Sequence, residues 1–479
     1  MFYINQFNCI MMTLITIIKR FMTSIKSESA AFNLVNEYLK EHYPNLKVTD
    51  VQLNTIIKEA FSHLKNTGKG MKRKYRKGFA LGVQEKQTLI QAVKDILVSP
   101  DTPWNPSVAS FSETQQLFFD LMRGNAPPIT DLIKHPSLLK AIVWKKNPEL
   151  LDGAKTLVQE VLLDIHREIR SREITANESL HFEIMIGDIL SLFPFLDPKK
   201  ENSLTVPIQI NGIWQLIDYQ VEPIPITPKW MGSPYMAYGL VPKNNPEAPP
   251  LLLYKGTTYP TDKGFLMSLL IDLNPFASVG SYGFHLGRAT IKKWLESHAS
   301  HSKVIVYGKS LGGAQAWRTA LYFPSYVKKV MAYGAPGPSS RDRRKLQRIL
   351  KNRPKLGIHF FYQKGDPIPL IGKTTKTGIK YYLILSGKPQ KGILAHAHMF
   401  STHENSTILS HASFHKNKKW QRRGTNILTL AVSLIAFPIL LTIAIVYNAL
   451  NQARKFLSKQ ISQLLSPSLR EHSSLSQNI

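Results

Sequence analysis

The sequence has little cysteine and few acidic side chains. A single cysteine, Cys9, occurs in 479 residues, so no disulfide can form within the chain and a disulfide-stapled scaffold is excluded. This usage fits a reducing compartment, or a fold that needs no bridges. Asp and Glu number 32 against 61 Lys and Arg, a formal net charge of +29. The excess favours polyanionic partners, namely acidic membranes, nucleic acids or acidic proteins, without choosing among them.

The common nucleotide and metal motifs are also missing. The sequence contains neither a Walker loop nor G-x-G-x-x-G. A lone cysteine gives no support to zinc or iron sites, and His396 with His398 is the closest-spaced histidine pair. No signature of a nucleic-acid-binding fold accompanies the basic clusters Lys69 to Lys77 and Lys416 to Arg423. We therefore expect no metal and no cofactor, and rank nucleic acid below a membrane as partner.

The longest apolar run lies near the C-terminus, from Ile427 to Tyr447, and contains no charged residue. About 20 apolar residues span a bilayer, and Pro438 is better tolerated in a membrane helix than in a soluble one. The segment before this run, Lys416 to Arg423, carries more cations than the segment after it. The positive-inside rule therefore predicts that the part of the chain before the run is cytoplasmic and that the C-terminal tail lies on the opposite side of the membrane. We expect one C-terminal transmembrane helix near anionic lipids; a buried core helix is the alternative.

Hydrophobic spacing divides the chain into a helical part and an alternating strand–helix part. Before about residue 200 apolar residues recur at helical spacing. Beyond residue 204 two strand-like runs flank Asn211-Gly212, a strong hairpin signal. From residue 251 strands and helices alternate, which predicts parallel strands joined by crossover helices. The expected domains are an all-α domain at 1–200, an α/β domain at 201–415, and a basic segment, membrane helix (427–447) and polar tail at 416–479.

The candidate nucleophile is Ser310, in Gly308-Lys309-Ser310-Leu311-Gly312. This matches G-x-S-x-G, a pattern common by chance, but a strand-like run leads in and a helical pattern leads out. Such a strand-to-helix turn strains the serine backbone, keeps neighbouring side chains clear, and presents the hydroxyl at the carboxyl edge of the sheet. The alternative is a serine in an ordinary glycine-rich turn.

A serine needs a base and an orienting acid to act as a nucleophile. In this kind of fold the acid and then the histidine follow the serine along the chain. Asp366 directly follows the strand-like run GIHFFYQ, although a Gly-Asp-Pro turn would also place an aspartate there. The segment ILAHAHMFSTH offers His396, His398 and His403. We favour His398, with His396 close behind, because only geometry can separate them.

The transition state of ester cleavage is an oxyanion that needs two N–H donors. One is expected to be the backbone N–H of Leu311, directly after the nucleophile. The other is expected from Gly256-Thr257, after the strand-like run LLLYK. Together these residues predict a serine hydrolase that cleaves esters through an acyl-enzyme.

In their order along the chain, these segments resemble the motifs of class 3 (fungal-type) lipases. YKGTT, GKSLGGA, YGAPGP and GDPIPL stand where those enzymes show F-R-G-T/S, G-H-S-L-G-G-A, F-G-x-P and D-x-V/I-P, followed by a late histidine. The resemblance covers about residues 204 to 415. It implies an α/β-hydrolase fold with a mostly parallel sheet, a lipid ester as substrate, and the following site residues: Thr257 and Leu311 in the oxyanion hole, and Ser310, Asp366 and a histidine near 398 as the triad.

Two departures from that pattern concern lysines. Lys309 stands for the usual histidine and Lys255 for the usual arginine. Neither is required for acyl transfer, but they leave a second interpretation, a membrane-bound scaffold or adaptor with an inactive hydrolase fold. A third interpretation, nucleic-acid binding, rests on charge alone. The apolar segment FLMSLLIDL after the oxyanion loop is expected to be either an interfacial lid or a buried helix.

Overall fold

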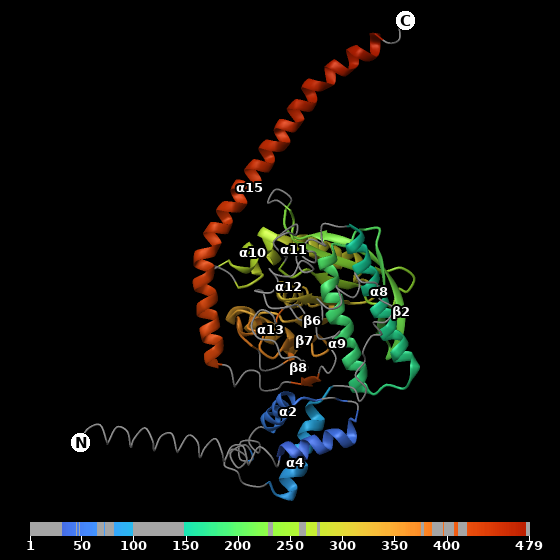
Figure 1. Ribbon diagram of the computed structural model, residues 1–479, viewed down its shortest axis with the longest axis vertical. Coiled ribbons are helices and arrows are strands. Elements are labelled where there is room, and N and C mark those ends of the chain that lie inside the picture. Colours follow the sequence, from blue (N-terminus) through green and yellow to red (C-terminus); the bar gives the residue numbers. More distant parts are fainter. Residues whose placement is uncertain are drawn as a thin grey trace, which may run out of the picture.

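The computed structural model describes residues 31–44, 46, 48–64, 71, 81–98, 148–228, 233–257, 265–274, 278–374, 378–385, 396, 407–410 and 419–475. A central β-sheet carries helices on both faces, and one long helix runs along its side (Figure 1). The described part of the chain therefore has an α/β fold.

A single nine-stranded sheet follows the chain order from β1 to β9. Strands β1 to β4 pair antiparallel, β4 to β8 pair parallel, and β9 returns antiparallel to β8. The mostly parallel sheet of the sequence prediction is therefore a mixed one. Its strands are β1 (Ser203–Ile210), β2 (Ile213–Pro225), β3 (Met236–Pro242), β4 (Leu251–Tyr254), β5 (Val304–Lys309), β6 (Val327–Tyr333), β7 (Gly357–Gln363), β8 (Lys380–Leu385) and β9 (Thr407–Ser410).

The direction of the crossover connections determines which face of the sheet the connecting helices cover. From β4 to β8 each connection moves one strand in the same direction, so right-handed crossovers put the connecting helices on one face. The helices are α2 (Asp50–His63), α4 (Val83–Ile96), α8 (Pro148–Ser171), α9 (Ala176–Leu192), α10 (Phe265–Asp272), α11 (Ser281–His298), α12 (Leu311–Tyr322), α13 (Ser340–Asn352) and α15 (Lys419–Leu475), with short 3₁₀ helices η2 (Phe193–Leu196) and η4 (Ile368–Leu370).

The hairpin predicted at Asn211-Gly212 is confirmed. Ile210 pairs with Ile213 across the turn. Asn211 and Gly212 have φ values of 50° and 86°, the two positive values that a two-residue turn needs to match the strand twist.

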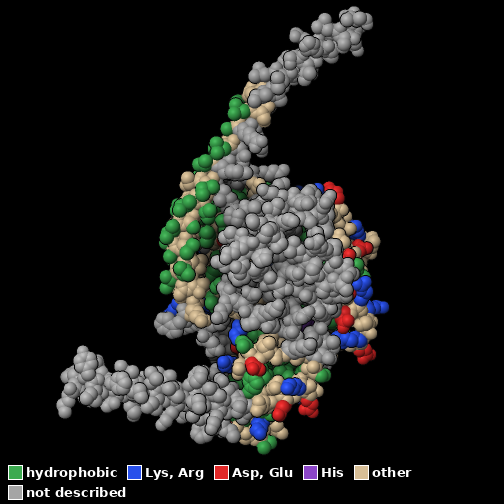
Figure 2. All heavy atoms as spheres, in the orientation of Figure 1, with side chains coloured by type: hydrophobic (Ala, Val, Ile, Leu, Met, Phe, Trp, Pro, Cys, Tyr) green, Lys and Arg blue, Asp and Glu red, His purple; other side chains and the backbone are tan. Residues whose placement is uncertain are grey.

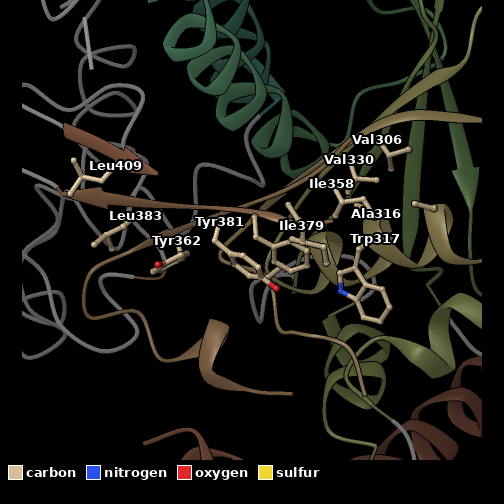
Figure 3. Packing of buried hydrophobic residues seen from close by; sticks show 14 of the residues in the cluster. Val306, Ala316, Trp317, Val330, Ile358, Tyr362, Ile379, Tyr381, Leu383 and Leu409 are labelled. Atoms are coloured by element: carbon tan, nitrogen blue, oxygen red, sulfur yellow. The ribbon is translucent and has the colours of Figure 1, made fainter. Parts of the chain in front are cut away.

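The face that bears the crossover helices is held by a tightly packed core. Val306, Val330 and Ile358, from three parallel strands, point toward Ala316 and Trp317 of α12 (Figure 3). All five side chains are buried, and the Trp317 indole N–H donates to the Pro336 carbonyl at 3.1 Å. This packing fixes the angle at which α12 leaves β5, and hence the turn between them.

The other face of the sheet is covered by α8 and α9, which the sequence assigned to a separate helical domain. Both helices share one apolar core with β1 to β6. The Tyr333 hydroxyl of β6 donates to the Ile184 carbonyl of α9 at 2.8 Å, and a Cβ on Gly187 would lie 3.0 Å from the Tyr307 ring. The predicted boundary at residue 200 therefore cuts through a single core. Helical periodicity predicts which face of a helix is buried, but it does not show which element packs against that face.

Helices α2 and α4 contact the end of the sheet that is formed by β8 and β9. Gln52 donates to the Leu385 carbonyl of β8 at 3.1 Å, and Lys364 donates to Thr55 at 2.6 Å. The Val98 N–H, two residues after α4, donates to the Ile408 carbonyl of β9 at 3.0 Å. The described N-terminal helices thus extend the edge formed by β8 and β9.

The predicted membrane segment lies within α15, a helix of 57 residues. Its stretch Gln421–Ile443 is long and apolar enough to cross a membrane and is mostly exposed. Hydrophobic side chains line its outer side (Figure 2). The stretch Ala176–Leu196 passes the same test by length and composition, but it is largely buried as the core helix α9 and η2.

Candidate active site

Ser310 occupies the sharp turn between β5 and α12. Its backbone has φ 56° and ψ −123°, a conformation that costs a non-glycine residue about 1–3 kcal/mol. The Ser310 N–H donates to the Tyr333 carbonyl at the end of β6, at 2.8 Å. Strain fixed by the neighbouring strand is the local geometry that the G-x-S-x-G motif predicts.

The glycines around Ser310 allow strand and helix to approach closely. A Cβ on Gly308 would lie 2.3 Å from the Gly312 carbonyl, and one on Gly312 would lie 2.3 Å from the Tyr254 carbonyl of β4. Real side chains do not tolerate such distances. The motif's outer residues are therefore glycines because α12 begins directly against β4 and β5.

The loop after β4 lies beside the turn. A Cβ on Gly256 would be 2.8 Å from the Lys309 carbonyl, so the loop that carries Thr257 packs against the turn from Gly308 to Gly312, which we call the elbow. The Thr257 hydroxyl donates to Asp272 at the end of α10. Leu311 is the first residue of α12, so its N–H has no acceptor within the helix. Of the two predicted oxyanion residues, Leu311 directly follows Ser310, and Thr257 follows a glycine that packs against Lys309.

Lys255, in the same loop, is a buried cation. Its side chain is only 2 % exposed and its ammonium group pairs with Asp197, which also accepts from the Tyr238 hydroxyl at 3.2 Å. Its backbone carbonyl accepts from the Tyr235 hydroxyl. These contacts hold the loop from both sides, because Asp197 follows η2 and Tyr235 precedes β3.

Asp366 and a histidine meet at the same edge of the sheet. Asp366 follows β7 and is buried, and its Oδ1 accepts from the Ile368 N–H at 2.9 Å. Its Oδ2 lies 3.0 Å from Nδ1 of His396. The sequence favoured His398, which lies outside the described residues together with His403. The histidine that the structure places on the aspartate is the second choice, His396.

Gly334 lies between the Asp366–His396 pair and the residue that binds the Ser310 backbone. It follows Tyr333, whose carbonyl accepts from Ser310, and it has φ +55°. A Cβ at this position would lie 3.0 Å from Cε1 and Nδ1 of His396 and 3.1 Å from Oδ2 of Asp366. The imidazole therefore rests on the backbone beside the elbow. Sequence reasoning noted YGAPGP but gave this glycine no function.

Two further ionisable groups border the site. Burial lowers the pKa of the Lys309 ammonium group, while the charges of Asp188 and Asp366 act in the opposite direction. Burial raises the pKa of Asp272 to about 7, although the bond from Thr257 opposes that change. Ser310 thus has a buried lysine directly before it, and the loop after β4 is bonded to a carboxyl group whose pKa burial raises to about 7.

Histidines that precede the serine are engaged elsewhere. His298 lies 3.1 Å from Glu222, and the His285 ring packs edge-on against Tyr322, with centroids 5.5 Å apart. Within the described ranges, no group of three or more His, Cys, Asp or Glu side chains could hold a metal ion.

Comparison with known proteins adds little to this geometry. No family model and no curated protein matches the chain. Among solved structures, the match to a triacylglycerol lipase from Penicillium expansum has 13% identity and a TM-score of 0.27, and covers 43% of this chain and 78% of the lipase. A likeness this distant carries no argument, so the function must be argued from the site.

Proposed function

We propose that the chain is a serine hydrolase of the α/β-hydrolase type that cleaves carboxylic esters, with lipid esters as substrates. The observation that carries the proposal is that a strained Ser310 and the pair formed by buried Asp366 and partly buried His396 lie against the same segment, Tyr333-Gly334. A nucleophile, a base and an orienting carboxylate are the groups that acyl transfer requires.

In this proposal each nitrogen of His396 has its own role. A proton on Nδ1 would donate to Asp366, which leaves Nε2 unprotonated and able to accept the Ser310 hydroxyl proton. The serine oxygen then attacks the ester carbonyl, and the alcohol leaves with that proton. Water repeats the sequence on the acyl-enzyme.

The oxyanion is assigned to the N–H groups of Leu311 and Thr257. Each preorganised donor of this kind contributes about 10²–10³-fold to turnover. The bond from the Thr257 side chain to Asp272 holds this residue in place. Thr257 is thereby anchored before substrate arrives, which is the condition for electrostatic preorganisation.

The lipid substrate class is proposed from α15. A helix with a long exposed apolar stretch attached to the catalytic domain would bring the site to a membrane. The proposal includes the sequence-based expectation of attachment through this helix near anionic lipids, with the catalytic domain in the cytoplasm.

A reactive-serine probe tests the chemistry. We expect a fluorophosphonate to label the native full chain and not Ser310→Ala, and ester turnover to fall by about 10⁴–10⁶-fold because nucleophilic catalysis is lost. Ser297→Ala is the matched control, since Ser297 is an exposed serine on α11. Labelling of Ser310→Ala at the native rate, or retention of a large share of its turnover, would refute the assignment.

One observation favours the alternative, an inactive membrane-bound scaffold. Lys309 is buried directly before Ser310, and the charge of Asp366 favours its ammonium form although burial lowers the pKa of that group. An ammonium group there would compete with His396 for the carboxylate and weaken the base. A natively folded chain that the probe does not label, and that hydrolyses no ester, would establish this alternative.

A further inference from the structure

The first half of α15 contacts the catalytic domain through one stripe of side chains. Arg422 donates to Thr374 at 2.6 Å, and Asn426 accepts from the Gly372 N–H at 2.8 Å. Further along, Ser433 is only 3 % exposed, and Phe437 and Leu440 are partly buried against the main core. Helix α10, which ends at Asp272, also contacts α15. Residues spaced by three, four or seven lie on one face of a helix.

The inward stripe is largely polar over its first three turns. Besides Arg422, Asn426 and Ser433 it includes Thr425 and Thr429, both half-buried. The two threonine hydroxyls donate to carbonyls four residues earlier, at 2.9 and 2.8 Å, so they need no water.

The outward face is predominantly apolar, and the hydroxyl of its exposed Thr442 donates to the Pro438 carbonyl within the helix at 2.9 Å. Its exposed large side chains are 41–70 % exposed, and the run from Ile427 to Tyr447 contains no charge. They form the green strip along α15 in Figure 2. The members between Gln421 and Ile443 are Ile427, Leu428, Leu430, Val432, Leu434, Ile435, Ile439, Leu441 and Ile443.

This arrangement reverses the pattern of a helix that faces water. A helix on a water-soluble domain turns its apolar stripe inward and its polar residues outward. Here polar groups bond to the domain, while a predominantly apolar face points away from it. Exposed apolar surface of this extent marks contact with a membrane or a protein. The exposed cation at its start, Arg423, matches the headgroup region of an anionic bilayer.

The length of the contact decides how the helix meets the bilayer. Contacts run from Arg422 to Leu440, which at 1.5 Å per residue is about 27 Å. The hydrocarbon core of a bilayer is about 30 Å thick. A helix that crossed it with this stretch would have to give up the whole contact with the domain.

We propose that α15 lies parallel to the membrane surface, with its inward stripe still docked on the catalytic domain and its outward apolar face in lipid. This replaces the spanning arrangement that the sequence alone suggested. Two consequences follow: the C-terminal tail stays on the domain's side, and α10 with Asp272 lies next to the bilayer. The placement does not depend on Ser310 being a nucleophile.

A topology experiment separates the two arrangements. The full chain with Cys9→Ser and Ser474→Cys is synthesised in the presence of sealed membrane vesicles competent for helix insertion, and treated with a membrane-impermeant maleimide. We expect labelling without detergent, as for a Val83→Cys control on α4, which is 76% exposed. Protection of Ser474→Cys until detergent is added, with Val83→Cys labelled throughout, would overturn the parallel placement.

A flotation experiment tests the outward face. With vesicles of equal parts phosphatidylcholine and phosphatidylglycerol, we expect Leu428→Glu with Ile435→Glu to lower the partition coefficient by about a hundredfold, because two side chains leave lipid. The matched control is Val83→Glu with Ile213→Glu, which changes two residues of similar exposure elsewhere. Equal partitioning of the two double variants overturns the proposal. Ester turnover is measured in parallel, so a chain that binds but does not hydrolyse counts against the proposed function alone.

Discussion

Replacing Gly334 with alanine perturbs the proposed triad without altering any of its members. The new Cβ would lie 3.0 Å from the His396 ring atoms Cε1 and Nδ1 and 3.1 Å from Oδ2 of Asp366. Favourable separations between carbon atoms are about 3.5–4.0 Å. The methyl group must therefore displace the imidazole, the carboxylate or the backbone by about 0.5 Å or more.

The substitution has two separable effects. Gly334 has φ +55°, and a non-glycine residue in that region costs about 1–2 kcal/mol of stability. Displacement of a catalytic group by about 1 Å costs about 10²-fold in rate. We therefore expect kcat/KM for a soluble ester to fall by about a hundredfold, while the free energy of unfolding falls by about 1–2 kcal/mol.

Gly212 offers the matched control. It also has a positive φ, +86°, but a Cβ there would have no atom within 4 Å, and it lies in the turn between β1 and β2. Gly212→Ala should lose a similar amount of stability and keep its turnover. For each of the two variants, urea unfolding gives the free energy of unfolding, and hydrolysis of a short soluble ester gives kcat/KM.

The two variants can refute the reasoning in different ways. If Gly334→Ala turns over ester within about threefold of Gly212→Ala, less than a displaced base should cost, then His396 is not held against Gly334 during catalysis. Equal losses of turnover in both variants would make lost stability the cause, and the geometric argument would fail as well.

Two other predictions concern the base and the oxyanion loop. Because Nδ1 of His396 lies 3.0 Å from Asp366, His396→Ala should abolish ester turnover while His398→Ala keeps most of it; the opposite pattern in the same assay would return the base to His398. Burial raises the pKa of Asp272 from 3.8 to about 7, so the unfolded chain loses this proton at lower pH than the folded chain. The resulting contribution to stability is full below about pH 4 and is lost as pH rises through about 7. Asp272→Asn should flatten this part of a pH series of urea midpoints, and an unchanged slope would contradict the shift.

Local chemistry accounts for the parts of the site that the sequence located. The elbow, the hairpin at Asn211-Gly212 and the position of Asp366 each depend on a few neighbouring residues. Glycines, a preceding strand and a turn dipeptide carry enough information to place them.

Long-range contacts account for what the sequence did not settle. His396 and His398 differ by two residues in a segment of ambiguous pattern, and only the approach of Gly334 and Asp366 distinguishes them. The sequence pattern also does not show which element packs against the apolar face of a helix. For this reason the sequence analysis assigned α8 and α9 to another domain. In α15 a signal existed: Thr425, just before the apolar run, recurs at helical spacing with Thr429 and Ser433 inside it, and this predicts a polar inward stripe.

The contact between Lys255 and Asp197 extends the catalytic unit toward the N-terminus. Lys255 is buried directly before Gly256 and Thr257, the loop proposed for the oxyanion hole, and its carboxylate partner lies just beyond η2, in the segment that follows α9. A buried charge that loses its partner costs about 3–5 kcal/mol, so a unit that began at residue 201 would leave this lysine uncompensated. It would also expose the sheet face that α8 and α9 cover. The smallest unit that keeps the oxyanion loop supported and the sheet covered therefore begins with α8, at Pro148. The helices that the sequence set apart are part of the framework that positions the site.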